Sequence, residues 1–316
     1  MSKPLAELSR HAREELGKAI VGHGDALQTL FLTLVCGGHA LLEGVPGLGK
    51  TLAVRTLAHI LSVRFRRVQC TPDLMPADIM GSNVFNTATG QFALHEGPVF
   101  TDLLLVDEIN RMPPRTQAAL LEAMEERQVT IDGVPHALSP LFTVIATQNP
   151  VEFEGTYPLP EAELDRFTVK IRIGYPDASD EEAILVRHQD SIDARLPAEI
   201  DTTAIHPDDL GAGRTEAARI RVEPALVGYI AAIARRTREW PAVALGASPR
   251  AAIHLMQMAK AVAATDARDY LLPDDVKRVA PAVLRHRLIV RPEADLEGVT
   301  ADQIVADVLA NVPVPK

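Results

Sequence analysis

The chain has 316 residues, of which 47% are hydrophobic, and a formal net charge of −10 with no block of basic residues. This length suits two domains or one large domain with a lid, and without clustered Lys and Arg the usual electrostatic footprint of nucleic-acid binding is absent. Cys36 and Cys70 make no disulfide framework. The N-terminus is too charged for a secretory signal, and no apolar run approaches the ~18 residues of a membrane span. We therefore expect a cytoplasmic protein with neither membrane nor nucleic acid as a partner.

Five short apolar runs in the first 190 residues predict buried strands. The runs are His39–Glu43, Phe65–Cys70, Leu103–Val106, Leu141–Thr147 and Phe167–Ile173. Helical patterns separate most of them, and strands that alternate with helices form a parallel sheet covered by helices. We predict an α/β fold whose first domain, residues 1–190, is an αβα core around a five-stranded parallel sheet.

Two hairpins interrupt this alternation. Asp132-Gly133 lies between VTI and VPHALS, which is a strong signal for a two-residue hairpin turn. Thr89-Gly90 lies between NVF and QFAL and gives a weaker signal. The five-stranded sheet needs neither hairpin, so each is either an ordinary surface loop or an added working part.

The strand signal stops after Pro176. Helical patterns cover residues 180–190, 222–239, 249–265, 273–287 and 301–310. The stretch 191–221 is polar and irregular, which is typical of a linker. Arg285-His286-Arg287 is expected on a helix surface rather than in a metal site. We predict a second, all-helical domain at residues 191–316.

Residues 44–51, GVPGLGKT, match the pattern G-x-x-x-x-G-K-[ST] and follow an apolar strand, as a phosphate-binding loop must. The glycines permit backbone angles that other residues resist, so the N–H groups of the loop can point at phosphate oxygens. Lys50 is expected to reach the β- and γ-phosphates, and the Thr51 hydroxyl is expected to bind Mg²⁺. A chance match is roughly a 1% event in a chain this long.

Another apolar strand, LLLVDE at residues 103–108, ends in Asp107 and Glu108. Ligands of open α/β sheets bind at the carboxyl ends of the strands, so these acids are expected beside a nucleotide. Asp107 is predicted to hold Mg²⁺ through water, and Glu108 is predicted to polarise the attacking water. The alternative is that both acids simply leave the strand into solvent.

Two residues farther along are candidates for contact with the γ-phosphate. Asn149 follows the apolar strand of FTVIATQNP and could orient the water, although Asn-Pro is also a common turn. Ser248 and Pro249 are predicted to cap and open a helix, which places Arg250 in the first turn, where the dipole disfavours a cation. Arg250 should therefore have an anionic partner, either a γ-phosphate or a nearby Asp or Glu.

Arg166 lies in PLPEAELDRF, residues 158–167, among Glu161, Glu163 and Asp165. The simplest interpretation is a solvated helix end where the arginine pairs with a neighbouring acid, a contact worth about 0–1 kcal/mol. The alternative is that Arg166 serves a site outside its own segment.

These pieces, in this order, resemble the AAA+ ATPases, and within them the MoxR family. The resemblance runs nearly end to end, and its most family-specific part is the long stretch at 103–131. The matching segments are IVGHGDAL (20–27), GVPGLGKT (44–51), TPDLMPADIMG (71–81), GPVF (97–100), LLLVDEINRMPPRTQAALLEAMEERQVTI (103–131), ATQNP (146–150), LPEAELDRF (159–167), SPRA (248–251) and LRHR (284–287). The small departures are Glu163 and His23, which stand where Gln is frequent.

The resemblance implies a P-loop AAA+ core with a helical lid, ATP and Mg²⁺ as cofactors, and a homo-oligomeric ring, often a hexamer. It implies a Walker A motif at 44–51, a Walker B motif at 103–108, a first sensor at Asn149 and a second at Arg250. The implied cofactor-binding residues are Ile20, Val21, Gly22, Gly44, Val45, Pro46, Gly47, Leu48, Gly49, Lys50, Thr51 and Asp107. Of these, Ile20–Gly22 would line the adenine.

In a core built this way, Arg166 lies away from its own loop and can face the γ-phosphate bound by the next subunit. The candidate catalytic residues are then Glu108, Asn149, Arg166 and Arg250. Whether Arg250 acts on its own nucleotide or on a neighbour's stays open. The hairpins near 83–96 and 129–142 would face the pore of the ring.

The function implied by the resemblance is an ATP-driven remodelling chaperone, in which hydrolysis moves the lid against the core and the ring reshapes a client protein. MoxR relatives often act with proteins that carry a von Willebrand factor A domain, although nothing in the sequence names a client. Two other functions stay open. The acidic charge argues against a nucleic-acid motor, and Glu108 argues against a nucleotide-gated scaffold that hydrolyses little ATP.

Overall fold

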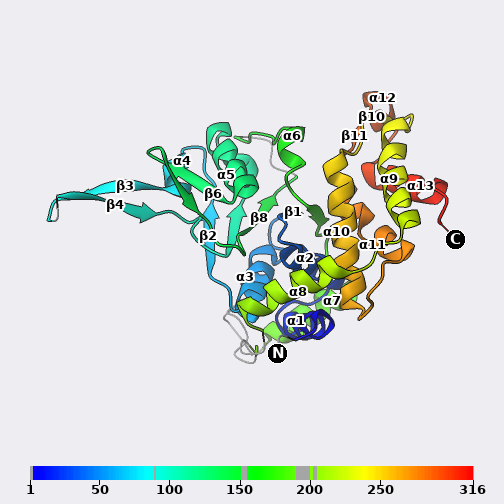
Figure 1. Cartoon of the computed structure of the whole chain (residues 1–316), viewed down its shortest axis with the longest axis horizontal. Coiled ribbons are helices and arrows are strands. Elements are labelled where there is room, and N and C mark those ends of the chain that lie inside the picture. Colours follow the sequence, from blue (N-terminus) through cyan, green and yellow to red (C-terminus); the bar gives the residue numbers. More distant parts are fainter. Residues whose placement is uncertain (1–2, 89, 151–154, 190–199, 202–204, 316) are drawn as a thin grey trace.

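The computed structural model describes residues 3–88, 90–150, 155–189, 200–201 and 205–315. Its centre is a parallel sheet with the strand order β2-β5-β8-β1-β9 (Figure 1). The strands are β1 (Ala40–Glu43), β2 (Phe65–Gln69), β5 (Leu103–Asp107), β8 (Thr143–Gln148) and β9 (Val169–Arg172). Each predicted apolar run contributes one strand, so the five-stranded parallel sheet is confirmed.

Side chains of the strands alternate between two apolar clusters, one on each face of the sheet. Leu103 and Leu105 belong to the cluster that holds Leu57, whereas Leu104 belongs to the cluster that holds Leu120. The first face is covered by α1 (Leu5–Ala19), α2 (Gly24–Cys36) and α3 (Lys50–Ile60), and the second by α4 (Pro76–Met80) and α5 (Pro114–Glu126). The predicted αβα core is therefore confirmed.

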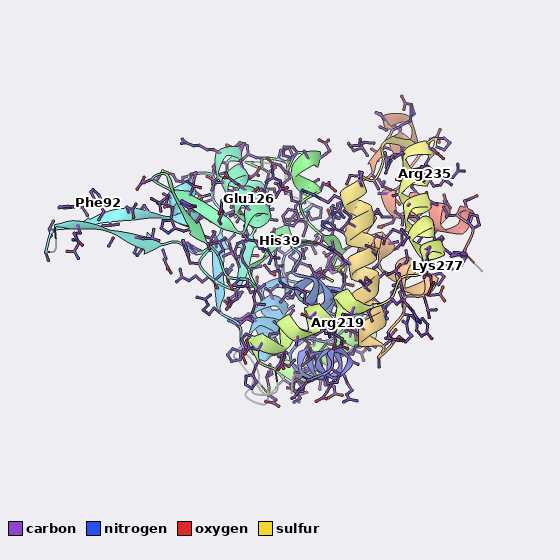
Figure 2. The ribbon with its side chains drawn as sticks, in the orientation of Figure 1. His39, Phe92, Glu126, Arg219, Arg235 and Lys277 are labelled. Carbon is purple, nitrogen blue, oxygen red and sulfur yellow. The ribbon has the colours of Figure 1, made fainter. Side chains whose placement is uncertain are left out.

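Both predicted hairpins are present. They are β3 (Gly81–Asn86) with β4 (Gln91–Glu96), and β6 (Gln128–Ile131) with β7 (Val134–Ala137). The β3–β4 hairpin projects far from the rest of the molecule, and its Phe92 lies out on this projection (Figures 1 and 2). Asn83 Nδ2 donates a hydrogen bond to Asp132 Oδ2 at 2.8 Å, which ties the two hairpins together. Thr89, part of the predicted turn, lies outside the described residues.

The C-terminal region is mostly helical. Its helices are α7 (Ala178–His188), α8 (Pro207–Arg219), α9 (Pro224–Glu239), α10 (Pro249–Thr265), α11 (Pro273–Leu284), α12 (Pro292–Leu296) and α13 (Ala301–Asn311). None of the helices in the described ranges is both long and apolar enough to cross a membrane. The predicted boundary between residues 190 and 191 falls outside the described residues.

Two predictions for this region are wrong in detail. The segment 191–221 is not simply irregular, because it contains α8. The sequence hides this helix because Gly213 is a poor helix former, but its lack of a side chain suits close packing, since a Cβ there would lie 3.0 Å from Leu5 Cδ1. The region is also not entirely helical, because β10 (Val243–Leu245) pairs antiparallel with β11 (Ile289–Val290).

The lid helices share one apolar core with the helices under the sheet. Helix α10 packs against α1, α2 and α8. Leu5 and Leu8 of α1 lie in the same buried cluster as Ala259 of α10 and Val305 of α13. Because interiors of this kind are packed as densely as crystals, a shift of the lid relative to α1 and α2 would disrupt close-packed apolar contacts.

His39 immediately precedes β1 and is buried in the middle of the molecule, where its ring contacts β8 and α5 (Figure 2). Its Nδ1 accepts a hydrogen bond from the Val144 amide at 2.9 Å, and its Nε2 lies 3.2 Å from the Met124 carbonyl oxygen. These partners suit a neutral ring with a proton on Nε2. Burial lowers the pKa of His39 to about 4 and that of His254 to about 3.

These buried histidines should make stability depend on pH. The unfolded chain takes up a proton at each below about pH 6.5, whereas the folded chain does not, so the stabilisation is complete above that pH and is lost as pH falls. We expect the free energy of unfolding to drop by about 1.4 kcal/mol per pH unit for each such histidine, once the pH is well below 6.5 and until it nears its folded pKa.

Urea unfolding at pH 7.5, 6.5 and 5.5 measures this slope. His39→Gln should show a shallower slope than the parent, and the exposed His59→Gln is the matched control. An equal slope in His39→Gln and the parent would show that His39 does not contribute to the pH dependence of stability.

Candidate functional site

The loop at residues 44–51 joins β1 to α3, which begins at Lys50. Gly47 and Gly49 have φ angles of 87° and 74°, a left-handed conformation that favours glycine. A Cβ at Gly44 would lie 2.5 Å from the Ile173 carbonyl oxygen, so this position also requires glycine. The glycines that define the sequence pattern are thus each required by the fold of the loop.

A cavity of about 520 Å³ opens against this loop. Its lining includes nine of the predicted residues: the loop residues 46–49, Lys50, Thr51, Asp107, Glu108 and Asn149. They meet because β1, β5 and β8 are neighbours in a parallel sheet, and their carboxyl ends lie at the same edge. This edge of the sheet, which we call the carboxyl edge, brings together the loop, both acids and the asparagine.

Lys50 folds back over its own loop. Its Nζ donates hydrogen bonds to the carbonyl oxygens of Gly44 and Val45, at 2.5 and 2.8 Å. Burial lowers the pKa of Lys50, and the charges of Asp107 and Glu108 act in the opposite direction. The ammonium group is therefore held at the mouth of the loop, where a phosphate would meet it.

Asp107 is held by two threonines and an arginine. Thr147 Oγ1 donates to Oδ1 at 2.9 Å, and Thr51 Oγ1 lies 3.3 Å from Oδ2. Arg67 Nε also donates to Oδ2, at 2.7 Å. The roles of Arg67 and Thr147 were not predicted from the sequence. Arg67 could have been identified from the pairing of β2 with β5, because this pairing places β2, which carries Arg67, beside Asp107 of β5.

Glu108 has a φ of 59°, which is uncommon for a residue other than glycine. Its amide donates to Thr147 Oγ1 at 2.9 Å. Its Oε2 accepts hydrogen bonds from Gln69 Nε2 and from Arg111, each at 3.2 Å. The carboxylate is therefore fixed beside the cavity instead of leaving into solvent.

Ile20 and Val21 line a second cavity of about 220 Å³, next to the loop residues Gly47, Leu48 and Gly49. The predicted adenine-binding segment therefore lies beside the phosphate-binding loop. Gly22 does not line this cavity. A Cβ on Gly22 would lie 2.3 Å from Asp180 Oδ2 of α7, so this glycine permits α7 to approach closely.

Helix α7 completes this second cavity with Ile184 and Arg187, neither of which was predicted from the sequence. Arg187 donates hydrogen bonds to the Gly17 and Lys18 carbonyl oxygens at 2.8 and 2.9 Å, which fixes α7 against the end of α1. No local pattern in the sequence marks these two residues, because they meet the cavity only through this packing.

Arg166 and Arg250 lie together at another place in the fold. Arg250 donates to Glu125 Oε1 at 2.5 Å, and Arg166 Nε lies 3.5 Å from Glu125 Oε2. The predicted acidic partner of Arg250 is therefore Glu125, from the end of α5. Arg166 pairs with the same distant glutamate and not with one of the acids beside it in the sequence. Neither arginine lines the cavity around the loop.

The arginines lie near the start of the strands, whereas the loop lies at their carboxyl edge. The Thr168 amide, two residues after Arg166, donates to the carbonyl oxygen of His39, which immediately precedes β1. The phosphate-binding loop follows the other end of β1. Strand β1 therefore lies between Arg166 and the loop of the same chain.

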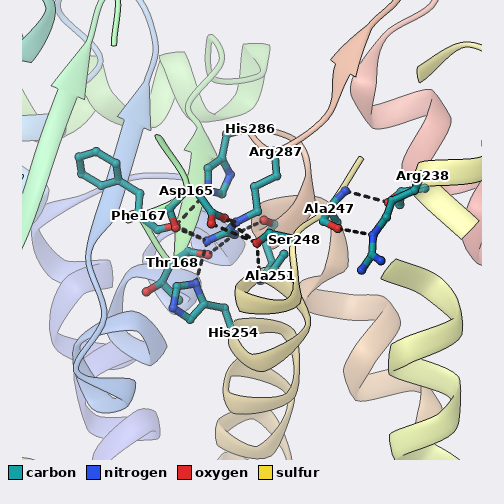
Figure 3. A network of polar contacts seen from close by, with 12 residues as sticks. Asp165, Phe167, Thr168, Arg238, Ala247, Ser248, Ala251, His254, His286 and Arg287 are labelled. Carbon is teal, nitrogen blue, oxygen red and sulfur yellow. Dashed lines mark hydrogen bonds and ion pairs between the residues drawn. The ribbon is translucent and has the colours of Figure 1, made fainter. Parts of the chain in front are cut away.

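A buried network fixes the segment that carries Arg166 to the lid (Figure 3). Arg287 Nε donates to Asp165 Oδ1 at 2.6 Å, and the Arg287 guanidinium also donates to the carbonyl oxygens of Phe167 and Thr168. Ser248 Oγ donates to Asp165 Oδ2 at 3.0 Å and accepts from the Ala251 amide, as the predicted N-cap should. We call these contacts of Asp165, Ser248 and Arg287 the lid latch.

The prediction that Arg285-His286-Arg287 lies on a helix surface is wrong. Helix α11 ends at Leu284, and His286 and Arg287 are only 9% and 6% exposed. His286 Nε2 lies 3.0 Å from the Phe167 carbonyl oxygen. His286 and Arg287 therefore lie in the interior beyond the end of the helix, and not on a helix surface. A buried guanidinium needs several hydrogen-bond acceptors, and the segment around Asp165 supplies them to Arg287.

Comparisons with known proteins agree with this geometry. The model of the ATPase family associated with various cellular activities (AAA) matches residues 39–169, and the AAA lid domain model matches residues 235–308. Chaperone MoxR1 of Mycobacterium tuberculosis is 40% identical, over 96% of this chain and 81% of its own length. Protein MoxR of Methylorubrum extorquens is 31% identical, over 95% of this chain and 93% of its own length.

A crystal structure of a Cytophaga hutchinsonii protein superimposes with a TM-score of 0.89 at 40% identity, and covers 99% of this chain and 96% of the other. Sequence and structure therefore agree over almost the whole length. The chain belongs to the MoxR family of AAA+ ATPases.

Proposed function

We propose that this chain is a Mg²⁺-dependent ATPase that forms a homo-oligomeric ring, a hexamer, and uses ATP hydrolysis to remodel client proteins. Its nucleotide-binding core spans residues 1–190 and its lid residues 191–316. One observation carries the proposal: the cavity at the carboxyl edge gathers a phosphate-binding loop, two acids and an asparagine, while two arginines lie at the far end of β1.

ATP would lie across the two cavities. Ile20 and Val21 would contact the adenine, and the N–H groups of residues 44–51 and the start of α3 would bind the phosphates. Lys50 would exchange its two carbonyl acceptors for the β- and γ-phosphate oxygens. A charged donor gains more from a phosphate than from a carbonyl oxygen, so this exchange is favourable.

The residues beside the loop fit Mg²⁺. Thr51 and Asp107 offer a hydroxyl and a carboxylate 3.3 Å apart, and oxygen ligands of this kind suit this metal, which keeps several waters. A bound Mg²⁺ would neutralise charge on the phosphates. Asp107 Oδ2 also holds Arg67 at 2.7 Å, so Arg67 must shift if the metal approaches this oxygen directly, and can stay if a water intervenes.

Glu108 would take a proton from the attacking water, and Asn149 would orient that water. The left-handed backbone of Glu108 and its contacts with Gln69 and Arg111 hold the carboxylate beside the cavity. A scaffold that hydrolyses little ATP has no need of an acid held in this way, so the geometry favours the ATPase.

Arg166 and Arg250 would act on the nucleotide of the next subunit. Within one chain, β1 separates Arg166 from the loop, and the lid latch ties Ser248, two residues before Arg250, to the same segment. If the arginines come from a neighbouring chain, the ATPase site of a monomer lacks them. The separation of the arginines from the loop within one chain therefore supports assembly into a ring.

The remodelling role has support from a relative. Chaperone MoxR1, by its name, acts as a chaperone. We propose the same class of activity here, on a protein client that could carry a von Willebrand factor A domain. The net charge of −10 argues against nucleic acid as the client.

Glu108→Gln should bind ATP normally but hydrolyse it at least about 100-fold more slowly, because the amide cannot accept a proton. Calorimetry and phosphate release measure the two effects, and the exposed Glu122→Gln is the control. ATP should also hold the Glu108→Gln assembly together, so a larger species should appear on size exclusion. Normal turnover in this variant would assign the general base to another residue.

Mixing two inactive variants tests the trans role. Arg166→Ala should bind ATP through its intact loop but hydrolyse it poorly, since arginines supplied in trans are worth about 10³–10⁵ in rate. Lys50→Ala should lose tight ATP binding but keep its arginines. A mixed ring contains interfaces with both parts whole, so activity should partly return.

The control mixes Lys50→Ala with the Lys50→Ala/Arg166→Ala double variant, which leaves no intact loop and should stay inactive. If rings shown to contain both single variants recover no ATPase activity, Arg166 has no trans role and forms only a local ion pair.

A further inference from the structure

Glu125 joins two arginines that come from different parts of the chain. Arg166 follows the short helix α6 (Glu161–Leu164) of the core, and Arg250 lies in the first turn of α10 in the lid. One oxygen of the Glu125 carboxylate accepts from Arg250 at 2.5 Å, and the other lies 3.5 Å from Arg166. Both arginines lower the pKa of Glu125, Arg250 more strongly, so the carboxylate stays charged.

The backbones of the two arginines are already fixed relative to each other. Asp165, next to Arg166, accepts a hydrogen bond from Ser248, the N-cap of the helix that carries Arg250. Arg287 holds the same Asp165 from the lid. The lid latch therefore brings the two positions together but does not direct the side chains.

Two guanidinium groups held this close repel each other. Arg250 also lies at a helix N-terminus, where a positive charge is disfavoured. A carboxylate between the two groups offsets both effects, and without it the side chains would spread apart. Glu125 engages one nitrogen of each arginine, and a guanidinium has five N–H donors. The same arginines can therefore bind Glu125 and a phosphate at once.

We propose that Glu125 is a positioning residue: it holds Arg166 and Arg250 side by side as one two-arginine site for the γ-phosphate bound by the next subunit. This inference rests on the ATPase function proposed above. In this proposal Glu125 contacts neither the nucleotide nor the attacking water, and it acts only through the two arginines. Neutralisation of Glu125 should lower turnover and should leave nucleotide binding by the phosphate-binding loop of the same chain unchanged.

Glu125→Gln is the test, because glutamine keeps the size and removes the charge. In assembled rings kcat should fall about tenfold while the KM for ATP stays within about twofold, since the loop cavity is untouched. Glu125→Asp, which keeps the charge on a shorter side chain, should lie between Glu125→Gln and the parent. Glu126→Gln, on the neighbouring exposed glutamate, is the matched control and should behave as the parent.

A second measurement separates positioning from a general structural role. Glu125→Gln should have no further effect on kcat in an Arg166→Ala/Arg250→Ala background, because there is nothing left to position. A further loss there, with weaker ATP binding, would show a structural role and overturn the inference.

The remaining outcomes also decide. A kcat for Glu125→Gln equal to the parent would make Glu125 an ordinary surface partner, and a raised kcat would make it a restraint on the arginines; either result overturns the positioning role. If Arg166→Ala and Arg250→Ala each slow turnover in the same assay, the proposed function survives that failure. If neither does, the proposed function fails and the inference falls with it.

Discussion

A parallel strand has its two ends at opposite edges of the sheet, and the site of this protein depends on that constraint. The phosphate-binding loop must follow the carboxyl end of β1, where the acids of β5 and the asparagine after β8 also emerge. Arg166 lies just before β9, whose start is beside the start of β1. Arg166 and the phosphate-binding loop are therefore kept apart within one chain, which is why we propose that they meet across an interface between two chains.

The lid latch adds a second constraint. Breaking a buried charged pair leaves a desolvated charge at a cost of about 3–5 kcal/mol, so Asp165 and Arg287 should stay paired through the reaction cycle. The lid also shares an apolar core with α1 and α2. A large movement of the lid against its own core is thus disfavoured, contrary to the simplest expectation from the sequence.

The sequence predicted what local patterns encode. The five strands, both hairpins and the cavity residues Lys50, Thr51, Asp107, Glu108 and Asn149 follow from short motifs and from the geometry of parallel sheets. Helix α8 was missed because tertiary packing against Leu5 outweighs the poor helix propensity of Gly213. Arg67, Glu125 and Arg287 were missed or misplaced because each acts through a partner 40 to 125 residues away, a pairing that no local pattern carries.

A structure of the Glu108→Gln ring with ATP tests the central claim most directly. The account predicts that the terminal nitrogens of Arg166 and Arg250 lie within hydrogen-bond distance, about 2.7–3.2 Å, of the γ-phosphate held by the neighbouring chain. Glu125 should still lie between the two arginines. Contact of either arginine with the nucleotide of its own chain, or an interface in which both stay remote from any phosphate, would contradict it.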